Sequence, residues 1–246
     1  MFPLKVLTFG RGDPEDFSLK GYDIAAEAIA KLKDRSYMLI FVGAPDGKQE
    51  EVAENLLKSG ISKCQLTVRK FLESKKRLKE LFCEVDLVIM PSRTEGFGLT
   101  ALEAMSAGLP ILVSGNSGFG DTLRTLPSGK SCVVDSEEPK IWAKAIAHVR
   151  RKDRAKRLQK VKGLRTSYEE QFNWEKQCEA LVKKMWCLVH GKAYAQLKIV
   201  LVSIFKIFKS YVYKLSETYL ICFEVLFSYV FCTLYDSHDA YGMDLP

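Results

Sequence analysis

The chain has 246 residues, of which 47% are hydrophobic, and it carries a formal net charge of +7. This length is enough to bury one full hydrophobic core, or two small ones. The seven cysteines are odd in number and form no Cys-x-x-Cys pair. The N-terminus lacks the charged region and long apolar run of a secretory signal. These features argue against a disulfide framework or a cysteine metal centre and favour a cytoplasmic protein with reduced thiols.

Strand and helix candidates alternate along most of the chain. Short apolar runs predict strands at residues 5–9, 37–42, 65–68, 86–90, 111–114 and 131–134. Several runs are continuous, as expected for strands that are buried on both faces of a sheet. Helix candidates lie between them at residues 22–32, 48–58, 75–83, 99–106, 121–126 and 138–149. This alternation predicts an α/β fold with a Rossmann-like, doubly wound parallel sheet, which we assign with its C-terminal helices to residues 1–190.

Ligands bind such sheets beyond the carboxyl ends of the strands. Arg11, the turn at 43–48, the segment at 69–72 and the turn at 92–98 all follow predicted strands. We therefore expect one ligand site at this edge of the sheet.

The turn at 92–98 and the helix after it carry the strongest functional signal. Glu95 and Glu103 lie eight positions apart across a glycine-containing turn, and the helix begins near Gly98. The free N–H groups of a helix N-terminus bind anions, and carboxylates accept hydrogen bonds from hydroxyls. The pattern predicts a ligand with phosphates and hydroxyls, such as a nucleotide sugar. The alternative is that Glu95 is simply an acid that the helix dipole stabilises near the helix N-terminus, and that Glu103 is an ordinary exposed helix residue.

This junction resembles the Glu-x7-Glu signature of retaining GT-B glycosyltransferases, the glycosyl transferases group 1 family (family 4-like). Further segments match that family in the expected order: a Gly-Arg…Lys-Gly segment, a second strand and turn, a small-Gly-x-Pro-hydrophobic link and an aromatic-x-Trp segment, at residues 9–23, 39–43, 107–111 and 172–175. All of them correspond to the C-terminal, donor-binding half of the GT-B fold.

The resemblance implies glycosyl transfer from a nucleotide-diphosphate sugar with retention at the anomeric carbon. Arg11 and Lys20 would hold the diphosphate, while Glu95 would face the donor sugar. Glu103 would bind the ribose hydroxyls. The donor would also contact the backbone of Gly96, Phe97, Gly98 and Leu99. No Asp-x-Asp motif is present, so we expect no metal and no other cofactor.

Three segments depart from the family pattern or lack an assigned role. Residues 12–19 form a longer and more acidic loop than usual, which makes Lys20 the less secure assignment. Lys70 replaces a typical glycine, and it would either obstruct the base or reach a phosphate. Residues 115–120 look like a dinucleotide fingerprint without the right spacing, and we interpret them as a flexible turn on the donor-sugar side.

The family match covers one domain of a two-domain fold. We therefore expect a GT-B N-terminal domain, in cis or in trans, to supply the contacts to an unidentified acceptor. No nucleic-acid partner is expected. The alternative function is a non-catalytic nucleotide-sugar-binding or protein-interaction module of a larger protein.

The last third of the chain has two unusual segments. Residues 150–165 are densely basic, and we interpret them as a solvated helix face, with a phosphate- or membrane-binding patch as the alternative. The tail at 191–246 has apolar runs at 199–208 and 219–235. The second run is close to the ~20 residues that span a bilayer, although it contains Glu224. A membrane anchor and a spurious translated segment are the two interpretations of this tail.

Overall fold

The computed structural model describes residues 3–190. Residues up to Asn173 form one compact unit, and helix α9 (Trp174–His190) belongs to a second unit. The predicted tail at 191–246, with its apolar runs at 199–208 and 219–235, lies outside the described residues. Among the helices that are described, none is long and apolar enough to cross a bilayer.

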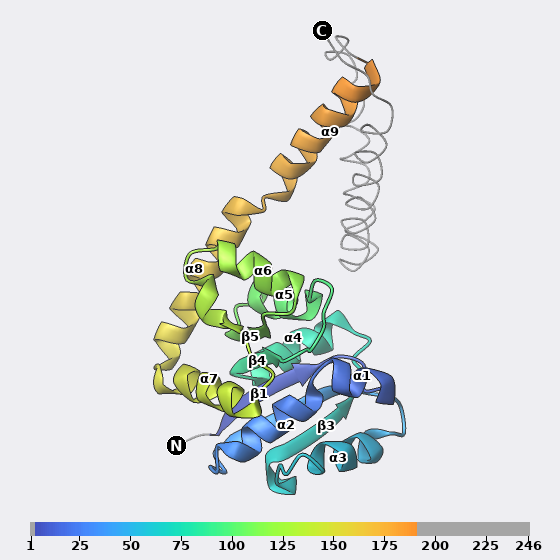
Figure 1. Cartoon of the computed structure of the whole chain (residues 1–246), viewed down its shortest axis with the longest axis vertical. Coiled ribbons are helices and arrows are strands. Elements are labelled where there is room, and N and C mark those ends of the chain that lie inside the picture. Colours follow the sequence, from blue (N-terminus) through green and yellow to red (C-terminus); the bar gives the residue numbers. More distant parts are fainter. Residues whose placement is uncertain (1–2, 191–246) are drawn as a thin grey trace. The chain divides into compact units, whose positions relative to one another are not determined.

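A parallel sheet forms the centre of the first unit (Figure 1). Its six strands lie in the order β3-β2-β1-β4-β5-β6, which confirms the predicted doubly wound, Rossmann-like sheet. The order reverses between β1 and β4, so their carboxyl ends lie side by side where folds of this kind bind ligands. The strands are β1 (Leu4–Phe9), β2 (Tyr37–Ala44), β3 (Leu66–Lys70), β4 (Leu87–Met90), β5 (Ile111–Ser114) and β6 (Val133–Val134).

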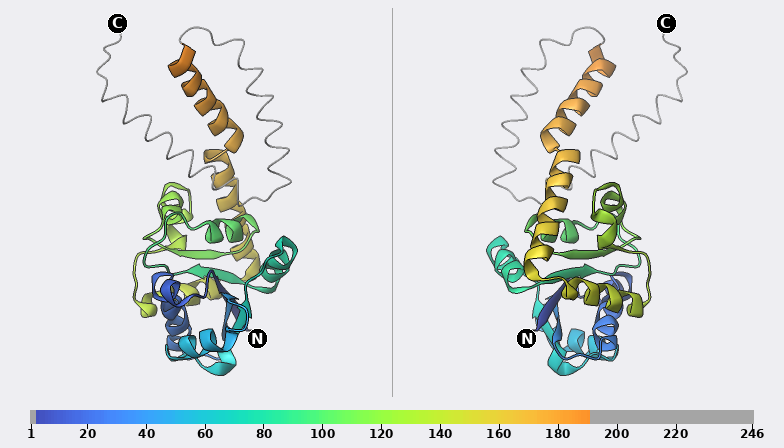
Figure 2. Two further views of the ribbon diagram at one scale, coloured as in Figure 1. Left: turned by 90° about the vertical axis from the view of Figure 1, so that its right-hand side faces the viewer. Right: turned by 90° about the vertical axis from the view of Figure 1, so that its left-hand side faces the viewer.

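Helices cover both faces of this sheet, as the two side views show (Figure 2). Helices α2, α3 and α7 pack on one face, where Tyr22 and Trp142 are fully buried. Helices α4, α5, α6 and α8 pack on the other, around Met105 and Phe119. The bounds of the helices in this unit are α1 (Pro14–Leu19), α2 (Tyr22–Lys31), α3 (Gln49–Leu57), α4 (Lys75–Glu84), α5 (Leu99–Ser106), α6 (Gly118–Thr125), α7 (Pro139–Arg151) and α8 (Arg154–Gln171).

Most predicted boundaries differ from the structure by no more than two residues, but three predicted segments are wrong in kind or extent. The expected loop at 12–19 contains α1, whose first turn carries a proline and two acids, both of which favour a helix start. The first half of the expected strand at 131–134 belongs to a short 3-10 helix, η2 (Gly129–Cys132), which leaves only two residues for β6. The helix expected at 121–126 begins earlier, at Gly118, because Ser117 caps it.

The basic segment at 150–165 spans two helices rather than one. Helix α7 ends at Arg151, and α8 begins at Arg154 after a break at Lys152 and Asp153. The Asp153 carboxylate caps α8 by accepting a hydrogen bond from the Lys156 N–H at 2.8 Å. Most of the charged side chains in the segment at 150–165 are exposed or half-buried, which agrees with the interpretation of a solvated surface.

A bidentate ion pair joins β3 to α4. Both terminal guanidinium nitrogens of Arg69 donate to the Glu84 carboxylate at 2.7 Å, and Lys5 Nζ lies 3.4 Å from the same group. The hydrogen bonds from Arg69 hold the pKa of Glu84 at about 2, below its ordinary value of 4.5. This group therefore contributes stability above about pH 4.5 and loses it as the pH falls towards 2.

We expect the Glu84→Gln variant to be less stable than the wild-type chain at neutral pH, by less than about 1 kcal/mol because the pair is about one-third exposed. The difference in the free energy of unfolding should shrink as the pH falls from about 4.5 to about 2. Urea denaturation at several pH values measures it. Glu73→Gln is the control, because Glu73 is exposed and forms no ion pair with the described residues. A difference that stays constant over this pH range would contradict the prediction.

Candidate functional site

Arg11 lies at the carboxyl end of β1, as predicted. The turn that carries it is held against β2, because the Gly10 N–H donates to the Val42 carbonyl at 3.1 Å and the Gly12 N–H donates to the Gly43 carbonyl at 2.9 Å. The Arg11 side chain is exposed and makes no hydrogen bond or ion pair with other described residues. Its guanidinium is therefore accessible to an anion at this edge of the sheet.

The Tyr22 side chain packs against the turn that carries Arg11. Its ring is fully buried against Phe41, and a Cβ at Gly10 would overlap its hydroxyl oxygen. Burial raises the pKa of Tyr22 above its ordinary value, and the nearby negative charges of Asp16 and Glu95 raise it further. The hydroxyl therefore stays protonated, and no described residue hydrogen-bonds to it.

Lys20 and Glu95 meet directly, although 75 positions separate them in the sequence. Lys20 follows the last residue of α1, and Glu95 lies in the loop between β4 and α5. The Lys20 Nζ atom donates to Glu95 Oε2 at 2.7 Å, and both side chains are mostly buried. The sequence predicts one site for both residues but does not predict this contact. The ion pair places a cation and a carboxylate side by side above β4.

The loop that contains Glu95 is also fixed on its other side. The Glu95 N–H donates to the Asn116 carbonyl at 3.1 Å, the Gly118 N–H donates to the Gly96 carbonyl at 2.8 Å, and the Phe119 N–H donates to the Phe97 carbonyl at 2.7 Å. These backbone bonds hold Glu95, Gly96 and Phe97 against the segment that follows β5.

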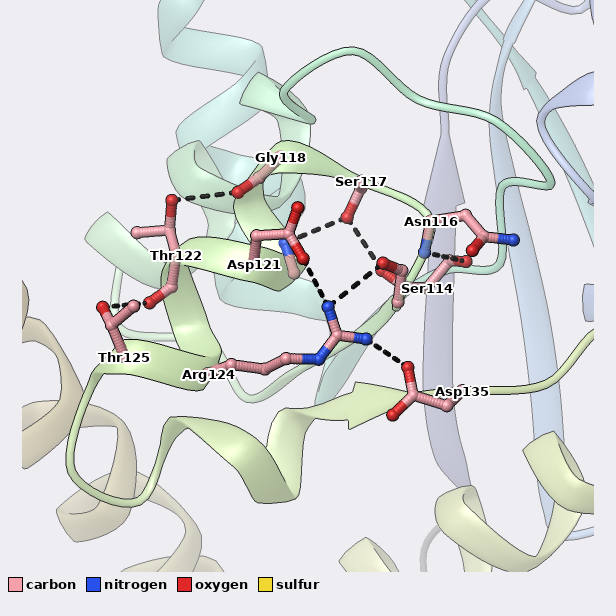
Figure 3. Close-up of polar contacts among 11 residues, drawn as sticks. Ser114, Asn116, Ser117, Gly118, Asp121, Thr122, Arg124, Thr125 and Asp135 are labelled. Carbon is pink, nitrogen blue, oxygen red and sulfur yellow. Dashed lines mark hydrogen bonds and ion pairs between the residues drawn. The ribbon is translucent and has the colours of Figure 1, made fainter.

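The segment at 115–120, which we expected to be a flexible turn, leads into α6, and its last three residues form the first turn of that helix (Figure 3). The Ser117 hydroxyl accepts from the Gly120 N–H at 3.0 Å and donates to the Ser114 carbonyl at 2.8 Å. Arg124 Nη1 donates to the Gly115 carbonyl at 3.3 Å, and Nη2 pairs with Asp135 after β6. Arg124 thus connects the residues that follow β5 and β6, and the segment after β5 contacts the Glu95 loop.

The N-terminus of α5 lies next to Glu95. Gly98 precedes the helix in the left-handed region with φ of +97°, and a Cβ there would lie 3.4 Å from Glu95 Cγ. Helix α5 begins at Leu99, and Glu103 is half-buried farther along it. The first N–H groups of the helix have no partner within it, which makes this end favourable for an anion. A small pocket at this point is lined by Met90, Ser92, Glu95, Gly98, Ala101, Val113, Ser117 and Phe119.

The segment at 69–72 contributes less to this edge than the sequence predicts. The Arg69 guanidinium is held by Glu84, so it does not face the proposed ligand. Lys70 is exposed and lies 3.3 Å from Asp46 in the turn after β2. Phe71 is 61% exposed. Its backbone N–H donates to the Ala44 carbonyl at 3.1 Å. The two expectations for Lys70 stay open.

Sequence reasoning missed Arg93 and Asp23. Two Arg93 nitrogens donate to the Asp23 carboxylate at 2.9 and 2.8 Å, next to the Lys20–Glu95 pair. An arginine two positions before Glu95, the first residue of the Glu-x7-Glu motif, was the available signal. In the described part of the chain, no cluster of three or more His, Cys, Asp or Glu residues could hold a metal ion, and Cys64, Cys83, Cys132 and Cys187 are free thiols.

Residues 2–181 match the family described as family 4 glycosyltransferases in conflict systems. The chain belongs to this family. It is similar to the D-inositol 3-phosphate glycosyltransferase of Rhodococcus opacus, with 30% identity over 185 residues, which cover 72% of this chain and 40% of that protein. The counterpart in Acidothermus cellulolyticus is 29% identical over 185 residues, 72% of this chain and 39% of that protein. The chain thus spans about 40% of the length of these curated relatives.

Solved structures show the same type of fold, that of GT-B proteins, for this chain. The sucrose-phosphate synthase of Thermosynechococcus elongatus superposes with a TM-score of 0.60 at 22% identity, covering 76% of this chain and 46% of that one. The Anabaena protein HepE, solved in complex with UDP and glucose, superposes with a TM-score of 0.58 at 19% identity, covering 74% and 48%. In each case, the shared fold extends over about half of the larger protein.

Proposed function

We propose that this chain is the donor-binding domain of a retaining GT-B glycosyltransferase and that it binds a nucleotide-diphosphate sugar. The observation that carries the proposal is the meeting of Lys20, Glu95 and the N-terminus of α5 at one strand edge, with Arg11 following β1 at that same edge. The complex of HepE with UDP and glucose supports a donor of this class.

In the proposed complex, the two cations and the helix N-terminus stabilise the leaving diphosphate. The negative charge on that group grows as the glycosidic bond to the nucleotide breaks, so positive groups at fixed positions favour the transition state. Lys20 exchanges its bond to Glu95 for one to a phosphate oxygen. Glu95 then accepts hydrogen bonds from the sugar, near the anomeric carbon.

Glu103 binds the nucleotide in this proposal. A carboxylate only accepts hydrogen bonds, so it suits the two neighbouring hydroxyls of a ribose. Arg11, Lys20 and the N-terminus of α5 neutralise the diphosphate, and we propose that no metal ion takes part.

Transfer also requires an acceptor held opposite the donor. We propose that a GT-B N-terminal domain, in cis or in trans, supplies that second wall, because catalysis requires both reactants to be positioned. A non-catalytic nucleotide-sugar-binding module is the second candidate. It is favoured by Lys70, which replaces a typical glycine of the family pattern. Sugar transfer that depends on Glu95, after a matching N-terminal domain is added, would exclude it.

Donor binding is tested by thermal shift with UDP, GDP, ADP and their glucose conjugates. We expect one nucleotide series to raise the melting temperature, because a ligand at 100 times its dissociation constant stabilises the fold by ~2.7 kcal/mol. The matching nucleoside without phosphates serves as the control ligand and should give a much smaller shift. If no nucleotide or conjugate produces a shift at millimolar concentration, the proposed function is wrong.

A further inference from the structure

Arg93 lies in the loop that leads to Glu95, and all three nitrogens of its guanidinium contact other residues. Its two terminal nitrogens bond to the Asp23 carboxylate at 2.9 and 2.8 Å, and Nη1 also donates to the Ser18 carbonyl at 2.5 Å. Its Nε atom lies 3.3 Å from Glu137, in the loop before α7. Three separate segments of the chain are therefore joined at one half-buried side chain.

The backbone reinforces the same junction. The Arg93 N–H donates to the Leu19 carbonyl at 2.9 Å. Gly21 has a φ of +67°, and a Cβ there would overlap the Pro91 carbonyl oxygen. Contacts of the 91–93 segment with residues 18–23 therefore lie on both sides of Lys20 in the sequence. The position of Lys20 relative to Glu95 depends on how these two segments are held together.

We infer that Arg93 is a positioning residue that sets the distance between Lys20 and Glu95, and thereby the fit of the diphosphate and the sugar of the donor. This inference rests on the proposed function. A lysine side chain has many rotamers, so a short Lys20–Glu95 contact requires its two backbone segments to be fixed. A planar guanidinium that bonds a carboxylate through two nitrogens fixes both distance and orientation, which a lysine at position 93 would not do.

A purely structural role for Arg93 predicts a loss of stability and nothing else. Arg69 provides the matched control, because it also forms a bidentate pair, with Glu84, and is exposed to a similar degree, at 38% against 31%. The variants to compare are Arg93→Gln, Arg93→Lys and Arg69→Gln. Asp23→Asn is the second route, because it weakens the same contact and keeps the Arg93 bond to Ser18, should Arg93→Gln fail to fold.

The first measurement needs no ligand. Acetic anhydride modifies exposed amines, and the rate at Lys20 is compared with that at Lys31, which pairs with Glu27 at 3.0 Å. We expect Arg93→Gln and Asp23→Asn to raise the Lys20 rate by about threefold, the factor expected for loss of a partly exposed ion pair. Lys31 should not change, and Arg69→Gln should leave both rates unchanged.

The second measurement is calorimetry with the UDP and UDP-glucose pair, or with whichever nucleotide pair the thermal shift identifies. Arg93→Gln should reduce the preference for the conjugate over the free nucleotide by about tenfold, and Arg93→Lys should not restore it. An unchanged preference together with an unchanged Lys20 rate would overturn the inference. If the wild-type chain binds no nucleotide, the proposed function fails, and the acetylation rate alone decides whether Arg93 positions Lys20.

Discussion

Replacing Gly43 by alanine is expected to lower the free energy of unfolding by about 3–5 kcal/mol, among the largest effects of a single substitution. Gly43 lies near the end of β2 with a φ of +129°, which disfavours any side chain. A Cβ at this position would also overlap the carbonyl oxygen of Gly10, which is backbone and cannot move aside without displacing β1. The loss of stability should appear as a lower midpoint in urea denaturation.

Gly47→Ala is the matched control for this prediction. Gly47 also has a positive φ, of +77°, but a Cβ there would have no atom within 4 Å. Alanine at position 47 is therefore disfavoured only by the backbone conformation, and we expect the free energy of unfolding to fall by about 1–2 kcal/mol. Similar losses for the two variants would show that the close approach of β1 and β2 at Gly10 and Gly43 does not matter. Arg11 should also lose its position in Gly43→Ala, because the Gly12 N–H bonds to the Gly43 carbonyl.

The two glutamates should separate nucleotide binding from sugar binding. Glu103→Ala is expected to weaken the free nucleotide and its sugar conjugate by a similar factor of about 10–100, because both would lose the acceptor for the ribose hydroxyls. Glu95→Ala should weaken the conjugate by a comparable factor and leave the free nucleotide nearly unchanged. Calorimetry with the nucleotide and its glucose conjugate measures the two affinities for each variant.

The control for this pair is Glu54→Ala, which removes an exposed carboxylate from α3 and should change neither affinity. Equal losses for nucleotide and conjugate in Glu95→Ala would show that its assigned role is wrong. In that case, Glu95 would act on the diphosphate, through its ion pair with Lys20.

The parallel sheet could be predicted from the sequence because its central strands are continuous apolar runs. The run at 111–114 corresponds to β5 without any shift, and the run at 37–42 lies within β2. Such runs are typical of strands that are covered on both faces, and their alternation with helices leaves few topologies. The edge strand β6 was less predictable, because only Val133 and Val134 pair with β5. Short edge elements contain too few residues to show a periodicity.

The sequence by itself also determined which residues follow the strands. It therefore placed Arg11, Glu95 and the start of α5 at one edge, because parallel strands end on the same side of a sheet. Only the tertiary structure decided how those side chains are paired. Three side-chain contacts join segments that are distant in sequence or belong to different elements. They are the pairs Lys20–Glu95, Arg93–Asp23 and Arg69–Glu84. Such pairings depend on distances of a few ångströms between packed elements, and local sequence patterns do not encode those distances.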